Sequence, residues 1–341
     1  MNINMSGQAE GRYTLIGGNA SPYSLKMRAH MHYRRLPYNW ILRTVENDHL
    51  LEGLRPVLVP VLKLPEDGSL HLDSTKLIYL LEERHPDDRS VIPVDSAHAF
   101  LAHLVEDMAD EWVTKMMFHY RWAYDADIHY AARWIADDRS PGDTEEQREK
   151  FAQFFTDRQI GRMPLVGCTP ENAPIIEAGF HHILALLHAD VGQYKYLFGT
   201  RPSIADFGLY GQLRTLSIDP TPMSIMRDEA QRAESWLRQL DDASGIEGDW
   251  FAVGELPPMT KALITYSAEV YLPFLAANAA AIEKGKETFS VELDGKPYSQ
   301  GVFKYQVKCL DELKARYKAL PEEAKSVVDD LIGEAGIKIL S

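Results

Sequence analysis

The chain has 341 residues, more than one hydrophobic core normally organises, so two or three domains are expected. Its 36 basic residues against 50 acidic ones give a net charge of −14, which argues against nucleic acid or an anionic membrane as the main partner. The two cysteines, Cys168 and Cys309, form no paired motif, which excludes a disulfide scaffold and suits a reducing compartment.

Signals for targeting and for membrane insertion are not found in the sequence. Residues 1–12 form a polar tail without the apolar centre of a signal peptide. The longest apolar stretch, residues 271–282, is too short to cross a membrane and contains Pro273 and Asn278. We therefore expect a cytoplasmic protein without a membrane partner.

The first predicted element is a strand that turns into a helix. Residues 13–16 are an apolar run typical of a buried strand, which Gly17 and Gly18 end. Ser21 then stands where a helix begins, with Pro22 at the first helical position. This places a hydroxyl at the positive end of a helix, where an anion or a thiolate is stabilised. Taken alone, the pattern also fits a serine that only caps its helix.

A strand interrupted by proline and a capped helix follow. Pro60 lies in an apolar run, where it fits the first residue of a strand. A cis Val59–Pro60 bond would turn the backbone groups of Val59 toward a ligand. Farther on, a short strand leads through Asp73 and Ser74 into a helix whose N-terminus suits a carboxylate. Taken singly, these features are an edge-strand proline and an ordinary N-cap.

The remaining elements of this part predict a mixed sheet with helices. A helix is expected over 22–35 and a second strand over 39–45, which would make a parallel unit with the first strand. Asp67 and Gly68 mark the turn of a hairpin between two short strands. Together these elements follow the thioredoxin pattern.

In this order and spacing, these residues resemble the glutathione-binding half of the glutathione S-transferase family. The resemblance spans residue 13 to about residue 86. It resumes in the Arg-Pro-Ser-Ile-Ala-Asp-Phe run at 201–207, which is similar to the capping box of the family's helical domain. It implies a thioredoxin-like domain at 13–90, an all-helical domain at 95–245 and a homodimer. It also implies glutathione as the co-substrate.

The resemblance also implies roles for single residues. Ser21 falls on the position that activates the thiol. Val59 and Pro60 fall where the cysteinyl backbone of glutathione is bound, and Asp73 and Ser74 fall on the γ-glutamyl site. The segment at 55–59 departs from the family because it lacks the Asn-Pro-x-Gly-x-Val pattern, so the loop beside the thiol is expected to differ.

The residues around Ser21 permit a comparison of mechanism. Ser21-Pro22-Tyr23-Ser24 resembles the glutaredoxin Cys-Pro-Tyr-Cys motif with both sulfurs replaced by oxygen. Exchange of thiols and disulfides needs a thiolate at this place, so the site is expected to activate a bound thiol and to form no mixed disulfide. Tyr23 and Ser24 are the alternatives to Ser21, or its supporting residues.

A run of carboxylates follows at helical spacing, namely Glu106, Asp107, Asp110 and Glu111. No matching acidic cluster or Glu-x-x-His motif accompanies them, so we expect a solvated helix face and no metal site. The next run, 116–124, is aromatic on every side, which fits a core or a dimer contact. The resemblance places the hydrophobic-substrate pocket here, with Met117, Tyr120 and Tyr124 as candidates.

Residues 246–341 extend beyond the usual length of the family. Residues 257–284 read as helical with a break at Pro273, and Asp294-Gly295 marks a hairpin. An apolar stripe over 303–320 predicts a further helix that packs on other parts of the chain. We expect a mainly helical extension on the helical domain. Wrapping that domain, widening a dimer interface and covering the cleft remain three open roles.

The predicted function is that of a glutathione transferase. In this reaction the glutathione thiolate attacks a small hydrophobic electrophile, either by conjugation or by a glutathione-dependent cleavage or dehalogenation. The alternative is a non-enzymatic protein that uses the same fold to bind a ligand or to act as a scaffold. The sequence does not identify the electrophile.

Overall fold

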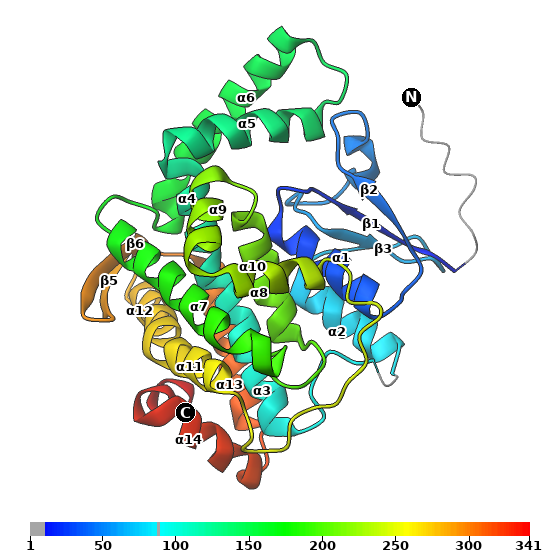
Figure 1. The fold of residues 1–341 in the computed structure, drawn as a ribbon. Helices are drawn as coiled ribbons and strands as arrows, with labels where there is room; N and C mark the ends of the chain where they lie inside the picture. Colours follow the sequence, from blue (N-terminus) through cyan, green and yellow to red (C-terminus); the bar gives the residue numbers. More distant parts are fainter. Residues whose placement is uncertain (1–10, 87–88) are drawn as a thin grey trace.

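The computed structural model describes residues 11–86 and 89–341 (Figure 1). Residues 1–10 of the predicted polar tail lie outside the described residues. The first part of the described chain contains a four-stranded sheet in the order β2-β1-β3-β4. Its strands are β1 (Tyr13–Gly17), β2 (Tyr38–Leu42), β3 (Val61–Lys63) and β4 (Leu70–His71).

The sheet is mixed and carries two helices, α1 (Pro22–Tyr33) and α2 (Ser74–Arg84). β1 runs parallel to β2 and antiparallel to β3, so that Leu15 pairs with Trp40 on one side and with Leu62 on the other. Leu15 and Leu62 are fully buried. α1 connects β1 with its parallel neighbour β2, as a parallel pair requires. The predicted thioredoxin-like fold is confirmed.

The rest of the described chain is largely helical, as predicted (Figure 1). A short 3-10 turn, η2 (Asp48–Leu51), precedes β3, and another, η4 (Met163–Val166), precedes α7. η3 is a π-helical turn that joins α3 to α4 without interruption. The helices after the sheet are α3 (Ser96–Met108), η3 (Ala109–Val113), α4 (Thr114–Ala123), α5 (Asp125–Arg139), α6 (Glu145–Ile160), α7 (Ala173–Tyr194), α8 (Ile204–Leu216), α9 (Pro220–Glu229) and α10 (Gln231–Leu240).

The buried helix α8 connects the sheet-bearing part to the helical part. It begins with the predicted capping box, in which the Asp206 carboxylate accepts hydrogen bonds from the Ser203 N–H and hydroxyl. It packs against α3 and against α1. A Cβ atom on Gly211 would lie 2.5 Å from the Pro22 carbonyl oxygen, so only glycine permits this approach. α8 therefore fixes the N-terminus of α1.

The extension consists of a long helix, a hairpin and two further helices. The helix is not interrupted at Pro273, so the break predicted there is wrong. α11 (Pro258–Tyr266) passes through the π-helical turn η5 (Ser267–Tyr271) into α12 (Leu272–Glu283). The helical run continues past Pro273, which lies just after η5, so the proline is accompanied by a local change from α- to π-helical hydrogen bonding. The predicted hairpin is confirmed, and Asp294 and Gly295 both have positive φ between its strands. The remaining elements are β5 (Thr288–Leu293), β6 (Lys296–Gly301), α13 (Lys304–Lys318) and α14 (Glu322–Leu340).

The extension packs along the helices that precede it. α11 contacts α7, whereas α13 and α14 contact α3. Figure 1 shows α12 and the β5–β6 hairpin on the side of the molecule away from the sheet. Buried side chains of the extension, such as Phe274 and Leu313, belong to the same hydrophobic cluster as Leu15 and Phe207. One apolar core therefore runs from the sheet into the extension.

Candidate active site

Ser21 lies between the end of β1 and the first turn of α1. It is the N-cap of α1, with φ −96° and ψ 115°, and Pro22 follows in the first turn. Its Oγ accepts a hydrogen bond of 3.2 Å from the Ser24 N–H. This bond uses a lone pair and leaves the hydroxyl proton available to a ligand. Ser21 also lines a cavity of about 400 Å³.

The two neighbouring candidates have other partners. Ser24 is fully buried, and its Oγ accepts from the Gly18 N–H at 3.2 Å, which ties α1 back to the end of β1. The Tyr23 hydroxyl donates to the Asp110 carbonyl at 3.0 Å. Burial, with Glu111 and Asp110 nearby, raises the pKa of Tyr23 well above its usual value. Of these three hydroxyls, that of Ser21 is the one that faces the cavity with its proton free.

The wall of the Ser21 cavity is largely apolar and comes from distant parts of the chain. The apolar side chains lie on α4, α5, α6 and η4, and include Met117, Phe118, Trp122, Ile135, Phe155 and Leu165. Glu111 and Lys115 add charged groups from the α3–α4 helix. The extension contributes Gln300, Phe303 and Gln306. The extension is thus part of the cavity wall, a placement that sequence reasoning left open.

Of the three predicted pocket residues, Met117 alone lines this cavity. Tyr120 is buried and packs its ring on Phe180 at a centroid distance of 4.9 Å. Tyr124 stacks on Tyr120, and its hydroxyl donates to Glu177 at 2.5 Å. The prediction for these two tyrosines is corrected, since they face α7 on the other side of α4. The helix is aromatic all round, so its pattern could not select the face.

The loop before β3 presents the Val59 backbone. The Val59–Pro60 peptide bond is cis, and so is Arg55–Pro56 in the segment that departs from the family pattern. Val59 is half-buried and Pro60 is buried. Within 11–86 and 89–341, neither the N–H nor the C=O of Val59 has a hydrogen-bond partner. Both groups are therefore available to an extended peptide.

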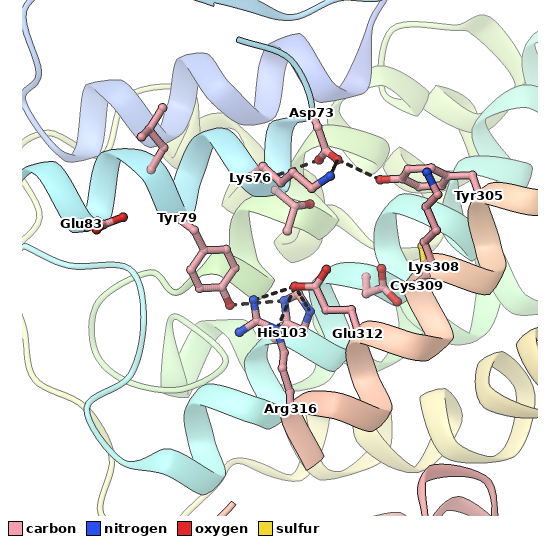
Figure 2. A pocket seen from close by; sticks show the side chains of 13 residues that line it. Asp73, Lys76, Tyr79, Glu83, His103, Tyr305, Lys308, Cys309, Glu312 and Arg316 are labelled. Atoms are coloured by element: carbon pink, nitrogen blue, oxygen red, sulfur yellow. Dashed lines mark hydrogen bonds and ion pairs between the residues drawn. The ribbon is translucent and has the colours of Figure 1, made fainter. Parts of the chain in front are cut away.

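The N-terminus of α2 carries Asp73 and Ser74. Asp73 is the N-cap and has a positive φ of 77°, and its Oδ1 accepts from the Lys76 N–H at 3.4 Å. Its Oδ2 accepts from the Tyr305 hydroxyl at 3.1 Å, and Figure 2 shows Tyr305 pointing from α13 toward this carboxylate. A groove of about 340 Å³ separates α2 from α13 below this contact. The extension thus reaches the predicted γ-glutamyl site.

The acidic run on the α3–α4 helix is not a solvated face, which corrects the prediction. Glu106 is fully buried, Asp110 is 7% exposed, and Asp107 and Glu111 are partly buried. The charges are tolerated inside because they have partners on other elements, of which the buried Lys26 on α1 is one. In the part of the chain that the structure describes, no group of three or more His, Cys, Asp or Glu has a metal-binding arrangement.

Lys26 connects this acidic run to the N-terminus of α2. Its Nζ bonds Glu106 and also Asp110, the latter at 2.7 Å. It donates to the Ser74 and Thr75 hydroxyls at 3.4 and 3.3 Å. Burial alone would lower the pKa of Lys26, but the two carboxylates outweigh it and raise that pKa. Burial and Glu106 raise the pKa of Asp110 to about 7, although Lys26 opposes them.

The structure therefore divides the predicted residues between two places. Ser21 and Tyr23 line the apolar cavity, while Asp73 lies at the upper end of the groove. Lys26, which sequence reasoning did not select, joins Ser74 to the carboxylates behind the cavity. A signal existed, because Lys26 lies four residues after Pro22 and three before Ala29, on the buried side of α1.

Comparison with known proteins bears on the first, thioredoxin-like part of the chain. Residues 15–89 match the family model of the glutathione S-transferase N-terminal domain. No curated protein matches the chain. None of the helices in the described ranges is long and apolar enough to cross a membrane.

Several solved structures are similar to the chain at low identity. A glutathione S-transferase from Rhodospirillum rubrum F11 is 17% identical over 74% of this chain and 91% of its own, with a TM-score of 0.43. Glutathione transferase GSTFuA3 from Phanerochaete chrysosporium is 15% identical over 71% of this chain and 100% of its own, with a TM-score of 0.47. A glutathione S-transferase from Ceriporiopsis subvermispora, in complex with glutathione, is 18% identical over 68% of this chain and 99% of its own, with a TM-score of 0.45.

The matched segment contains the turn that carries Ser21, the cis bond before Pro60 and the start of α2 at Asp73 and Ser74. Residues 15–89 thus carry the chain's similarity to the glutathione S-transferase N-terminal domain.

Proposed function

We propose that the protein is a glutathione transferase that activates the glutathione thiol through Ser21 for attack on a hydrophobic electrophile. The observation that carries this proposal is the position of Ser21. Its hydroxyl caps α1 and lines a largely apolar cavity, so a thiolate bound there meets a hydroxyl, a helix N-terminus and an apolar second substrate.

The peptide of glutathione would bind along the edge that Val59, Asp73 and Ser74 form. The N–H and C=O of Val59 would pair with the cysteinyl residue, since extended peptides bind through such free backbone groups. The N-terminus of α2 would hold the γ-glutamyl carboxylate, and the Asp73 carboxylate would hold its ammonium group. Pro60 keeps the loop that presents Val59 next to β3.

The energetics of the thiol favour Ser21 as the main activating group. Lowering a thiol pKa from ~8.5 by ~2 units needs ~2.7 kcal/mol of preference for the thiolate. A hydrogen bond to a charged acceptor supplies ~1.5–3 kcal/mol, and a helix N-terminus adds roughly 0.3–1 kcal/mol. The hydroxyl is thus the larger contribution, and the two together suffice.

The second candidate function is non-enzymatic binding of a ligand or partner. The observation in its favour is that the Tyr305 hydroxyl already occupies one oxygen of Asp73. A site partly filled by its own chain suits a protein that binds glutathione weakly. We retain a cytosolic location in the first proposal because two free cysteines suit a reducing compartment. The homodimer is retained on the family resemblance alone.

Calorimetry with glutathione and turnover of chlorodinitrobenzene test the proposal. The wild type should bind glutathione and consume the electrophile. Ser21→Ala should keep glutathione affinity within a few-fold and lose roughly tenfold or more in turnover, with the pKa of the bound thiol rising toward its free value. Absence of any heat with millimolar glutathione would leave the non-enzymatic function in the lead. An unchanged rate and thiol pKa in the variant would reduce Ser21 to a helix cap.

A further inference from the structure

We propose that Glu111 is a proton donor in the Ser21 cavity, which suits the cavity to electrophiles whose carbon–oxygen bond breaks on attack, such as epoxides and aryl ethers. The inference rests on the proposed function, because it needs a glutathione thiolate at Ser21.

Glu111 reaches the same cavity as Ser21. It lies in the π-helical turn η3, where α3 passes into α4, and π turns inside helices are frequent at functional sites. Its neighbour Asp110 turns toward Lys26, whereas Glu111 lines the cavity. The residue is partly buried and forms part of the cavity wall.

The extension supplies a hydrogen-bond partner that fits both protonation states of Glu111. Gln306 is 3% exposed, and its Nε2 donates to Glu111 Oε2 at 3.2 Å. The Gln306 Oε1 atom is buried and has no hydrogen-bond partner among the described residues. An amide donates to a carboxylate through its NH₂ group and, when turned round, accepts from a carboxylic acid through its oxygen. Gln306 can therefore hold Glu111 before and after proton transfer.

The surroundings of Glu111 favour a carboxyl group that keeps its proton near neutral pH. Burial, together with Asp110 and Asp73, raises the pKa of Glu111 to about 7, while Gln306 and Lys115 act in the opposite direction. A general acid works best when its pKa lies near the working pH.

Two other polar groups of the cavity, on Lys115 and Tyr23, are less suited to this role. Lys115 donates to the Val166 carbonyl at 3.0 Å and to Gln300 at 2.8 Å, and its ammonium group lies over the Phe274 ring. The Tyr23 proton is donated to the Asp110 carbonyl. Glu111 is the one carboxyl group among the described residues that line this cavity.

The chemical step balances with an epoxide as the electrophile. The glutathione sulfur attacks one ring carbon and forms a carbon–sulfur bond while the carbon–oxygen bond breaks. The electron pair of that bond moves to oxygen, which takes the proton of the Glu111 carboxyl and stays on the other ring carbon as the hydroxyl group of the product. The Glu111 carboxylate is then reprotonated from solvent. Attack on chlorodinitrobenzene instead expels chloride, which needs no proton.

These two reactions make a matched pair of assays for Glu111→Gln. Styrene oxide turnover should fall about 100-fold, since general acids contribute ~10²–10⁴ in rate, while chlorodinitrobenzene turnover should stay within about threefold. Glu111→Asp should recover part of the styrene oxide rate because it keeps an acid. Asp107→Asn is the control, since it removes a neighbouring, partly buried acid that bonds Tyr271 and does not line the Ser21 cavity.

The results of the two assays together support or overturn the role of Glu111. A selective loss on styrene oxide supports the proposal. Equal losses on both substrates, or no loss on either, would overturn it and leave Glu111 with a structural role. A wild type that turns over chlorodinitrobenzene but not styrene oxide would also overturn it. A wild type inactive on both, with no glutathione binding, would show that the proposed function itself has failed.

Discussion

Replacing Lys26 with methionine should test how much its buried ammonium group stabilises the two carboxylates that it bonds. The ammonium group of Lys26 bonds two carboxylates, and the side chains of Lys26, Glu106 and Asp110 are 0%, 0% and 10% exposed. Methionine keeps most of the volume and removes the charge. Two buried carboxylates would then lie next to each other without a cation.

The structure sets the expected size of this effect. Breaking a buried ion pair by removing one partner costs ~3–5 kcal/mol, since the remaining charge stays uncompensated. We expect a loss of this size in the free energy of unfolding at pH 8. Lys26 stays charged below that pH because its pKa is raised, so any pH dependence of this cluster in the wild type comes from Asp110.

In the variant, the carboxylates introduce a pH dependence. Burial already raises the pKa of Asp110 to about 7 against the opposing effect of Lys26. Without Lys26 that pKa rises further, so at pH 5 the Asp110 carboxyl is protonated and no buried negative charge remains on it. The loss should then shrink to ~1–3 kcal/mol, the cost of unmade hydrogen bonds.

Urea unfolding at pH 5 and pH 8 measures both values. Lys76→Met is the matched control, because Lys76 also pairs with a carboxylate, Asp73, but is 72% exposed and should cost ~0–1 kcal/mol. Adding Glu106→Gln to Lys26→Met should restore part of the loss at pH 8. A loss below ~1 kcal/mol at pH 8, or an equal loss at both pH values, would refute the reasoning.

Two further predictions concern the contacts of the extension. Tyr305→Phe removes the hydroxyl that bonds Asp73 and should tighten glutathione binding roughly two- to tenfold by calorimetry, the equivalent of one net hydrogen bond of ~0.5–1.5 kcal/mol; unchanged or weaker binding would contradict it. Burial raises the pKa of Asp107, so between the ordinary and the raised pKa the folded protein holds a proton that the unfolded chain has released. In this range the free energy of unfolding of the wild type falls by ~1.4 kcal/mol for each unit by which the pH rises. Asp107→Asn should therefore gain stability over the wild type as pH rises above the ordinary aspartate pKa of ~4, and a constant difference in urea unfolding would speak against it.

Local rules explain why the first part of the fold was predictable. The strand ending at Gly17, the cap at Ser21 and the proline after it are determined by neighbours a few residues away. The same holds for the capping box at Ser203 and for the turn at Asp294. In each case the sequence contains the partners within one turn of chain.

The parts of the site that the sequence did not reveal depend on distant contacts. Phe303 and Gln306 enter the cavity from the extension, far from Ser21 along the chain. Tyr120 packs against α7 because α4 has a neighbour there, which no pattern within α4 records. Which face of a helix is buried depends on the elements that pack against it. The sequence of the helix itself does not contain that information.

The acidic run shows how the extension determines the chemistry of the cavity. Asp107 bonds Tyr271 and Glu111 bonds Gln306, and both partners lie after residue 245. Their burial raises the pKa values of these two carboxyl groups. The prediction of a solvated acidic face considered α3 without this cover. An acid of the α3–α4 helix can therefore hold a proton in the cavity because the extension withdraws it from water.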